Sequence, residues 1–226
     1  MPTRSPAGKR PVVRAPGPSG VQLGEASARA MILQGAATVF SERGVRAVSV
    51  EDILKAAGIS RRTFYRLYQS KEDVVMALYQ LGTDRLLEAC KLALREESDP
   101  VRQLERCIDA HLRNARSFGR LVFVLGGDAQ NHESILHAHR MEVHQTLVSF
   151  LSSETPQNGG KKIDPLLFRS VLLALEGATR IMLEEDDEGR HVTDASIERV
   201  RRVMMRIATA ALAGSGASVA PLPFAE

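Results

Sequence analysis

The 226-residue sequence has only two cysteines, no apolar run long enough to cross a membrane and no hydrophobic signal core near residue 1. A membrane span needs about 18 consecutive apolar residues, so we expect a protein of the cytoplasm with no membrane partner. Cys90 and Cys107 both lie in apolar, helix-like surroundings. This is typical of small buried thiols in a reducing compartment, and a packed core needs no disulfide here.

Signatures of catalysis are also lacking. The sequence contains no nucleophile elbow, no phosphate-binding glycine loop and no paired metal ligands at helical spacing. Four histidines crowd one predicted helix: His132, His137, His139 and His144. They fall on two faces of that helix and do not converge on one tetrahedral centre. We therefore expect no enzyme, no cofactor and no bound metal, with an all-α enzyme that has an incidental basic face as the alternative.

Positive charge is concentrated in the first part of the chain. Residues 1–80 carry 12 Lys and Arg against 6 Asp and Glu, whereas residues 81–226 carry 18 against 21. The formal net charge of +3 thus combines a balance of +6 with one of −3. A basic segment of this kind is the electrostatic footprint of a nucleic-acid-binding domain.

Proline, glycine and hydrophobic periodicity predict the domain organisation. Residues 1–23 contain five prolines and no apolar periodicity, which predicts a disordered basic tail. Residues 24–80 and 81–213 show helical periodicity and no alternating strand pattern, so we expect two all-α domains. Residues 214–226 are again rich in glycine and proline and are expected to form a second disordered tail.

Three serine caps predict closely spaced helices in residues 24–80. Ser49 and Ser70 each precede an aspartate by three residues, which is the spacing of a capping box with Asp in place of Glu. Ser60 can cap a short helix between them. An amphipathic helix from about 26 to 43 comes before these caps, and a long helix that reaches about residue 97 follows them.

The second and third helices are separated by the three residues 58–60, which is the spacing of a helix-turn-helix. Phe64, Leu67 and Tyr68 lie at i, i+3 and i+4 and are expected to face the core. The opposite face of this short helix carries Arg61, Arg62, Tyr65 and Arg66. Arginine bonds guanine edges or grips phosphates, so this face is typical of a recognition helix.

Residues 48–79 resemble the DNA-binding domain of the tetracycline-repressor (TetR) family. The shared features are the turn Ala57-Gly58-Ile59-Ser60, Tyr65, Tyr68 and the Ser70-Lys71-Glu72 start of the next helix. The match extends back to about residue 26. Arg62 stands where the family often has glycine, which leaves the operator sequence open, and Tyr68 replaces a frequent phenylalanine.

The resemblance implies DNA contacts for eight residues: Ser49, Ser60, Arg61, Arg62, Thr63, Tyr65, Arg66 and Lys71. Ser49 would contact phosphate through its hydroxyl or through nearby helix-end amides. Tyr65 and Lys71 would also bind phosphates. Arg61, Arg62 and Thr63 would lie nearest to the base edges, and Arg66 at a phosphate or a base.

Residues 81–213 predict further helices at about 101–117, 118–126, 130–153, 165–186 and 194–213. Pro100 and Pro165 suit helix starts, and Gly126-Gly127 suggests a loop or helix end. The segment 166–182 is apolar on nearly every face and must be covered all round. In TetR-like proteins the last two long helices pair with those of a second copy. We therefore expect a homodimer through residues near 166–182 and 197–212, with an ordinary intramolecular core as the alternative.

By analogy with the family, a ligand pocket between the fifth and seventh helices would be lined by His111, Phe118, Phe123 or Met141. The sequence thus predicts an all-α protein with an N-terminal three-helix helix-turn-helix domain and a larger helical ligand-binding and dimerisation domain. Its predicted function is that of a transcriptional repressor, released from a palindromic double-stranded DNA operator by an unknown small-molecule effector. A DNA-binding dimer that responds to no ligand is the alternative.

Overall fold

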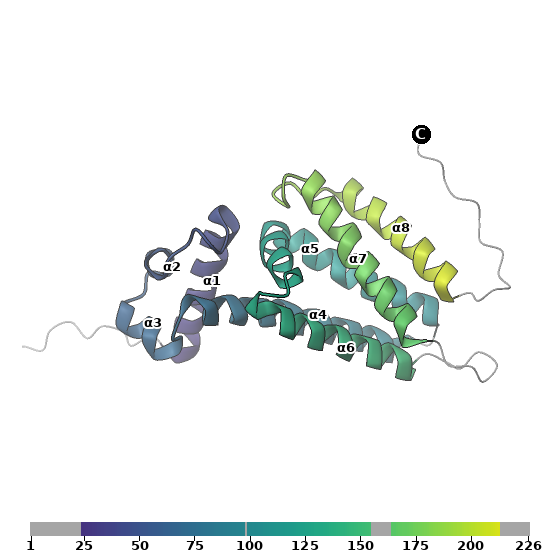
Figure 1. The fold of residues 1–226 in the computed structure, drawn as a ribbon, viewed down its shortest axis with the longest axis horizontal. Coiled ribbons are helices and arrows are strands. Elements are labelled where there is room, and N and C mark those ends of the chain that lie inside the picture. The colour runs from purple at the N-terminus through teal and green to yellow at the C-terminus, as the bar shows by residue number, and fades with distance from the viewer. Residues whose placement is uncertain (1–23, 98, 155–163, 213–226) are drawn as a thin grey trace, which may run out of the picture.

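The computed structural model describes residues 24–97, 99–154 and 164–212 (Figure 1). These ranges contain eight helices and no strand, so the predicted all-α fold is confirmed. The helices are α1 (Glu25–Arg43), α2 (Val50–Ala57), α3 (Arg61–Leu67), α4 (Lys71–Glu96), α5 (Pro100–Gln130), α6 (Ile135–Glu154), α7 (Pro165–Glu185) and α8 (Asp194–Leu212). The predicted tails, 1–23 and 214–226, lie outside the described residues. None of the described helices is long and apolar enough to cross a membrane.

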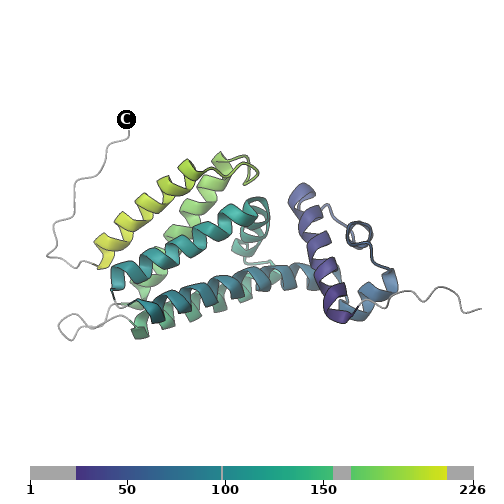
Figure 2. The ribbon, with the colours of Figure 1, turned by 180° about the vertical axis from the view of Figure 1, so that it is seen from behind.

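Helices α1 to α3 form a small unit at one end of the molecule (Figures 1 and 2), and α2 and α3 begin at their predicted serine caps. The Asp52 carboxylate accepts the backbone N–H of Ser49 at 2.8 Å, and the Ser49 hydroxyl accepts the backbone N–H of Asp52. Ser70 and Asp73 form the same box at the start of α4. Ser60 caps α3 by accepting the backbone N–H three residues on, at 3.1 Å. These bonds satisfy amide groups that a helix start otherwise leaves without partners.

The core of this unit requires a close approach of α1 and α2. Phe40 of α1 and Phe64 of α3 are completely buried in it. At Gly35 of α1, a Cβ atom would lie only 2.7 Å from the backbone nitrogen of Ala57. Since the neighbouring atom belongs to the backbone, only glycine fits between the two helices at this point.

Helix α4 joins the two parts of the molecule. Its first turns bury Val74, Val75 and Leu78 against α1 to α3, and later turns bury Cys90 and Leu94 in the C-terminal bundle. In both views α4 and α6 run side by side, and α7 and α8 form an adjacent pair at the outer side of the bundle. A second core, between α5, α7 and α8, is centred on fully buried Ile108, Leu112, Leu183 and Met204.

Helix α5 is broken at Phe118, whose backbone is non-helical (φ −130°, ψ 24°), at the boundary predicted between the helices 101–117 and 118–126. The predicted end at Gly126 is wrong, because the helix continues to Gln130. Gly126 and Gly127 both lie within the helix. A Cβ at Gly126 would meet nothing within 4 Å, and a Cβ at Gly127 would lie 2.5 Å from Nη1 of Arg180, the end of a flexible side chain that can shift. The next helix consequently starts at Ile135, five residues later than expected from the sequence.

We predict that Gly35→Ala destabilises the protein by about 1–3 kcal/mol, because the added methyl group forces α1 away from α2. Gly82→Ala, in α4, is the matched control, since a Cβ there meets nothing within 4 Å. It should raise stability by about 1 kcal/mol through helix propensity. Urea unfolding followed by circular dichroism measures both, and equal effects of the two substitutions would contradict the close approach.

Candidate DNA-binding surface and ligand cavity

The turn between α2 and α3 has the geometry predicted for a helix-turn-helix. Gly58 ends α2 in the left-handed conformation (φ 63°, ψ 32°), which lets the chain leave the helix sharply. Ile59 is buried against the core, as are Phe64 and Tyr68 on the inner side of α3. The Tyr68 ring is covered by the guanidinium of Arg29, 5.5 Å from the ring centroid.

The outer face of α3 is exposed. Arg61, Arg62, Tyr65 and Arg66 all have exposed side chains, and Tyr65 is 47% exposed although it is aromatic. Arg61 forms an ion pair with Glu51 of α2. Arg62 and Arg66 form no ion pair or hydrogen bond with other described residues. These two guanidinium groups are therefore available to an external anion or base edge.

Both serines predicted to contact DNA form hydrogen bonds within the protein. The Ser49 hydroxyl donates to the Asp52 carboxylate at 2.6 Å, and the Ser60 hydroxyl lies 2.9 Å from that of Thr63. Hydrogen bonds from Ser49 also hold the pKa of Asp52 well below its usual range, with help from Arg43. A phosphate at the start of α2 would thus meet backbone amides more readily than the Ser49 hydroxyl.

Lys71 also has a structural role, which the sequence did not reveal: it binds the connection between α1 and α2. Its ammonium group donates to the carbonyl oxygens of Val45 and Val48 at 3.0 and 2.9 Å, in the connection between α1 and α2. An ammonium group has three N–H donors, so one is left for a phosphate. The predicted phosphate contact of Lys71 stays a prediction.

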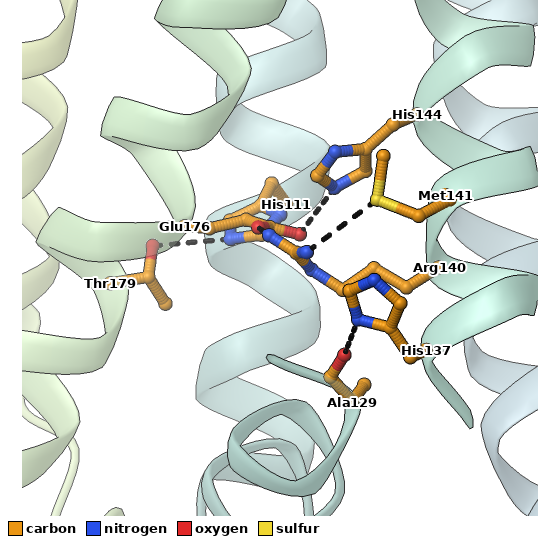
Figure 3. Close-up of polar contacts among 8 residues, drawn as sticks. All are labelled: His111, Ala129, His137, Arg140, Met141, His144, Glu176 and Thr179. Atoms are coloured by element: carbon orange, nitrogen blue, oxygen red, sulfur yellow. Dashed lines mark hydrogen bonds and ion pairs between the residues drawn. The ribbon is translucent and has the colours of Figure 1, made fainter. Parts of the chain in front are cut away.

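A cavity of about 600 Å³ lies between α1 of the N-terminal unit and α4, α5, α6 and α7. This is within the range of small-molecule sites. Its wall includes three of the predicted ligand residues, His111, Phe118 and Phe123. Met141 does not line it. The neighbouring residue Arg140 does, and the Met141 sulfur lies 4.0 Å from Nη1 of Arg140 (Figure 3).

Polar side chains from α5, α6 and α7 meet in one part of the cavity wall (Figure 3), which also includes Tyr79 of α4. Arg140 of α6 donates to Glu176 of α7 from Nε, at 3.2 Å, and from Nη2. On the other oxygen of the same carboxylate, His144 Nε2 lies 2.7 Å away. His111 Nε2 of α5 lies 3.1 Å from the Thr179 hydroxyl. We call the lining residues Tyr79, His111, Arg140, Glu176 and Thr179 the polar cluster.

The polar cluster is electrically balanced. Burial acts to raise the pKa of Glu176, but hydrogen bonds from His144 and Arg140 outweigh it and lower the pKa, so the carboxylate is charged. Burial lowers the pKa of His111, against the attraction of Glu176, and favours the neutral ring. Burial, assisted by the Glu176 charge, raises the pKa of Tyr79 to about 12. One cation, Arg140, therefore faces one anion.

His144 lies outside the cavity wall and contacts the Glu176 carboxylate of the polar cluster. Its Nδ1 is buried and has no hydrogen-bond partner. Its Nε2 lies 2.7 Å from Glu176 Oε1, so the ring fixes the position of that carboxylate.

The other histidines of the predicted cluster bind separate partners. His137 Nδ1 lies 3.1 Å from the Ala129 carbonyl oxygen, and His139 Nε2 lies 3.0 Å from the Thr83 hydroxyl. His132 is exposed. Among the described residues, no group of three or more His, Cys, Asp or Glu side chains could hold a metal ion.

Sequence reasoning missed Tyr79, Arg140, Glu176 and Thr179, as well as the part of α1 that lines the cavity. A signal for two of them was present. Glu176 and Thr179 are polar residues inside a segment that is otherwise apolar on nearly every face. A polar group that interrupts a buried helix needs a polar partner, and this predicts a site or a buried network.

Helices α7 and α8, which pack against each other, both expose large apolar side chains, and we call these residues together the outer stripe. Its members are Leu166, Leu173 and Ile181 of α7 and Val203 and Ile207 of α8, each between 41% and 65% exposed. Gly177 lies on the same side of α7, and a Cβ there would meet nothing within 4 Å. Ala178, by contrast, packs against the intramolecular core.

The fold and the exposed α3 define a helix-turn-helix protein with a helical C-terminal domain, and comparisons with known proteins agree. Residues 32–78 match the sequence model of the bacterial regulatory proteins of the tetR family. These residues therefore carry the DNA-binding-domain sequence of the TetR family, as the motif around residues 48–79 predicted.

The individual relatives differ in their sequence identity to this chain and in the share of each chain that the match covers. The transcriptional repressor KstR2 of Rhodococcus jostii is 43% identical over 60 residues, which cover 26% of this chain and 29% of KstR2. The structure of the TetR-family regulator PfmR from Thermus thermophilus is 27% identical, with a TM-score of 0.60, over 78% of this chain and 96% of PfmR. FadR of Bacillus subtilis, solved with stearoyl-CoA, is 19% identical with a TM-score of 0.66, over 78% and 97% of the chains. The curated relatives are matched over 29% to 53% of their own length.

We predict that Arg140→Met destabilises the protein by about 3–5 kcal/mol at neutral pH, because it leaves the Glu176 carboxylate buried without a cation. Adding Glu176→Leu should recover much of this loss.

The lowered pKa of Glu176 means that the pair stabilises the fold above the unfolded pKa of glutamate and loses its effect as the pH falls through the folded value. Without Arg140 that pKa rises, so the deficit of Arg140→Met should shrink as the pH is lowered. Urea unfolding at neutral pH and near pH 5 measures both effects. A deficit that grows at the lower pH would contradict the pairing.

Proposed function

We propose that this chain is a transcriptional repressor that binds a palindromic DNA operator as a homodimer and is released by a small molecule. The main observation in support of this proposal is the exposed face of α3. This capped helix follows a tight turn, and it presents the unpaired side chains of Arg62 and Arg66 beside exposed Tyr65. The relatives are named as transcriptional regulators, which gives no support to the enzyme alternative. Under this proposal the protein acts in the bacterial cytoplasm, where the operator lies.

The DNA-binding domain proposed here comprises residues 24–80, and residues 81–213 form the ligand-binding and dimerisation domain. In the proposed complex Arg62 reads a base edge, because its guanidinium is exposed and unpaired. Tyr65 and Arg66 bind the sugar-phosphate backbone on either side. Ser60 and Thr63 position the start of α3 through their mutual hydrogen bond. Arg61, held by Glu51, approaches the DNA only if that ion pair opens.

A small molecule is proposed as the releasing signal because the cavity touches the DNA-binding unit directly. Leu33 and Ala37 of α1 belong to its wall, together with side chains from α4 to α7. FadR of Bacillus subtilis, which shares the fold, was solved with stearoyl-CoA. A ligand that fills the cavity here contacts α1, so it can favour one position of α1 over another through differential contacts.

Selection of bound sequences from a random pool of duplex DNA tests the DNA-binding proposal. We expect the wild type to enrich a palindrome, with affinity that falls steeply as salt rises. Arg62→Ala should lose about 1–3 kcal/mol of discrimination at the base that it reads. Arg61→Ala is the matched control and should change the selected sequence less, because Arg61 is paired with Glu51. Failure of the wild type to enrich any sequence would overturn the proposal.

The dimer is proposed to form through the outer stripe, since a single chain leaves these apolar residues in water. We predict that Ile181→Glu gives a folded monomer, because a charge at the centre of the interface would be buried without a partner. Ile135→Glu is the matched control, because Ile135 is similarly exposed (48%, against 57% for Ile181) but lies on α6, outside the outer stripe. Sedimentation velocity should show Ile135→Glu as a dimer. A dimeric Ile181→Glu would place the interface elsewhere.

A further inference from the structure

We propose that the cavity binds an apolar small molecule that carries one uncharged oxygen function, a hydroxyl or a carbonyl group, at the end that meets the polar cluster. This inference rests on the proposed function, because it names the class of ligand for the same cavity. It derives from the charges and the unused hydrogen-bonding groups of the cavity wall.

The charges of the wall exclude an ionised ligand group at the polar cluster. Arg140 already neutralises Glu176. A ligand carboxylate placed here would lose its water and would meet the Glu176 carboxylate, with no uncommitted cation to compensate. A ligand ammonium group would likewise have to displace Arg140 from its partner.

The two other cations of the wall do not change this result. The Nε of Arg180 lies 3.1 Å from the Glu184 carboxylate, and its guanidinium lies over the Phe123 ring at 4.7 Å. Arg85 is exposed, so solvent screens its charge. Neither supplies a buried, unpaired positive charge beside Glu176.

Unused hydrogen-bonding groups explain why the ligand carries an oxygen. The Tyr79 hydroxyl forms no hydrogen bond with any described residue, although it lines the cavity beside Arg140 and Glu176. Its raised pKa keeps it protonated and able to donate. The Asn114 amide, one turn after His111 on α5, also lines the cavity without a partner in the described residues. A ligand oxygen can accept from these donors, and the Thr179 hydroxyl completes the set.

The body of the ligand is apolar because most of the remaining wall is. The apolar part includes Leu33 of α1, Leu78 and Leu86 of α4, and Phe118 and Val122 of α5. Burying hydrocarbon against such side chains contributes about 25 cal/mol for each Å² removed from water. Hydrocarbon burial thus supplies affinity, and the polar cluster selects the head group.

The test uses three ten-carbon probes that differ in the head group: decan-1-ol, decan-2-one and decanoate. Isothermal titration calorimetry with the full chain, without DNA, measures their affinities at neutral pH. We expect the wild type to bind the alcohol and the ketone at least about tenfold more tightly than decanoate. Tyr79→Phe should weaken ketone binding by about tenfold, because one buried hydrogen bond is lost.

Exchanging one charge should reverse the preference. Glu176→Gln removes the anion and leaves Arg140 without its partner, so decanoate should become the tightest of the three probes. Glu142→Gln is the matched control, since Glu142 is an exposed glutamate of α6 outside the cavity wall, and it should keep the wild-type order. Thermal unfolding establishes that each variant is folded. If Glu176→Gln does not fold, the affinity of Tyr79→Phe for decan-2-one tests the proposal instead: weaker binding than in the wild type supports it, and unchanged binding contradicts it.

Three results would overturn the inference: tightest binding of decanoate by the wild type, no binding of any probe, or an unchanged order in folded Glu176→Gln. Because these measurements use no DNA, they separate the two proposals. A chain that enriches an operator but binds none of the probes refutes the ligand class alone. A chain that binds the neutral probes and enriches no DNA refutes the proposed function alone.

Discussion

The packing of α1 is the constraint on which the rest of the structure depends, because this helix belongs to two sites at once. One face, with Ile32, Gly35 and Phe40, packs against α2 and α3 and holds the recognition helix in place. A neighbouring face, with Leu33 and Ala37, forms part of the cavity wall. The close approach at Gly35 leaves α1 little freedom relative to α2. Any displacement of α1 by a ligand must therefore carry the helix-turn-helix with it, because packed interiors transmit strain.

A polar contact ties the same helix to the far side of the bundle. Arg120 of α5 donates from Nε to the carbonyl oxygen of Ser41, in the last turn of α1, at 3.0 Å, and it also pairs with Glu188 in the turn between α7 and α8. That turn packs tightly on α5 at Gly119, where a Cβ would lie 2.4 Å from the Gly189 carbonyl oxygen. The non-helical residue Phe118 directly precedes this contact and lines the cavity. The break in α5 thus lies where the cavity, α1 and the α7–α8 turn meet.

The sequence was most informative where structure is decided locally. The capping boxes at Ser49 and Ser70 and the left-handed Gly58 depend on residues within four positions, and all were predicted correctly. Gly126-Gly127 misled because glycine is frequent at helix ends, whereas α5 continues through both residues and buries Leu125 and Ala129, on either side of them, in the N-terminal core. The pair of Arg140 and Glu176 joins residues 36 apart, a separation at which no sequence periodicity indicates a partner. His111, Phe118 and Phe123 were placed by family analogy, and the cavity has them in its wall.

Helix α7 shows how the cavity and the outer stripe could act on each other. Leu175 and Met182 face the core, Glu176 and Thr179 face the cavity, and Ile181 lies on the outer stripe. The helix is therefore apolar nearly all round for two reasons, since it is covered by its own bundle on one side and, in the proposed dimer, by a second copy on the other.

A ligand that moves the cavity face of α7 also moves the outer stripe, because one helix carries both. In a dimer this shift would change the distance between the two copies of α3, together with the direct push on α1. Two half-sites at a fixed spacing on DNA tolerate little change in that distance, so a small movement at the cavity is sufficient to weaken binding.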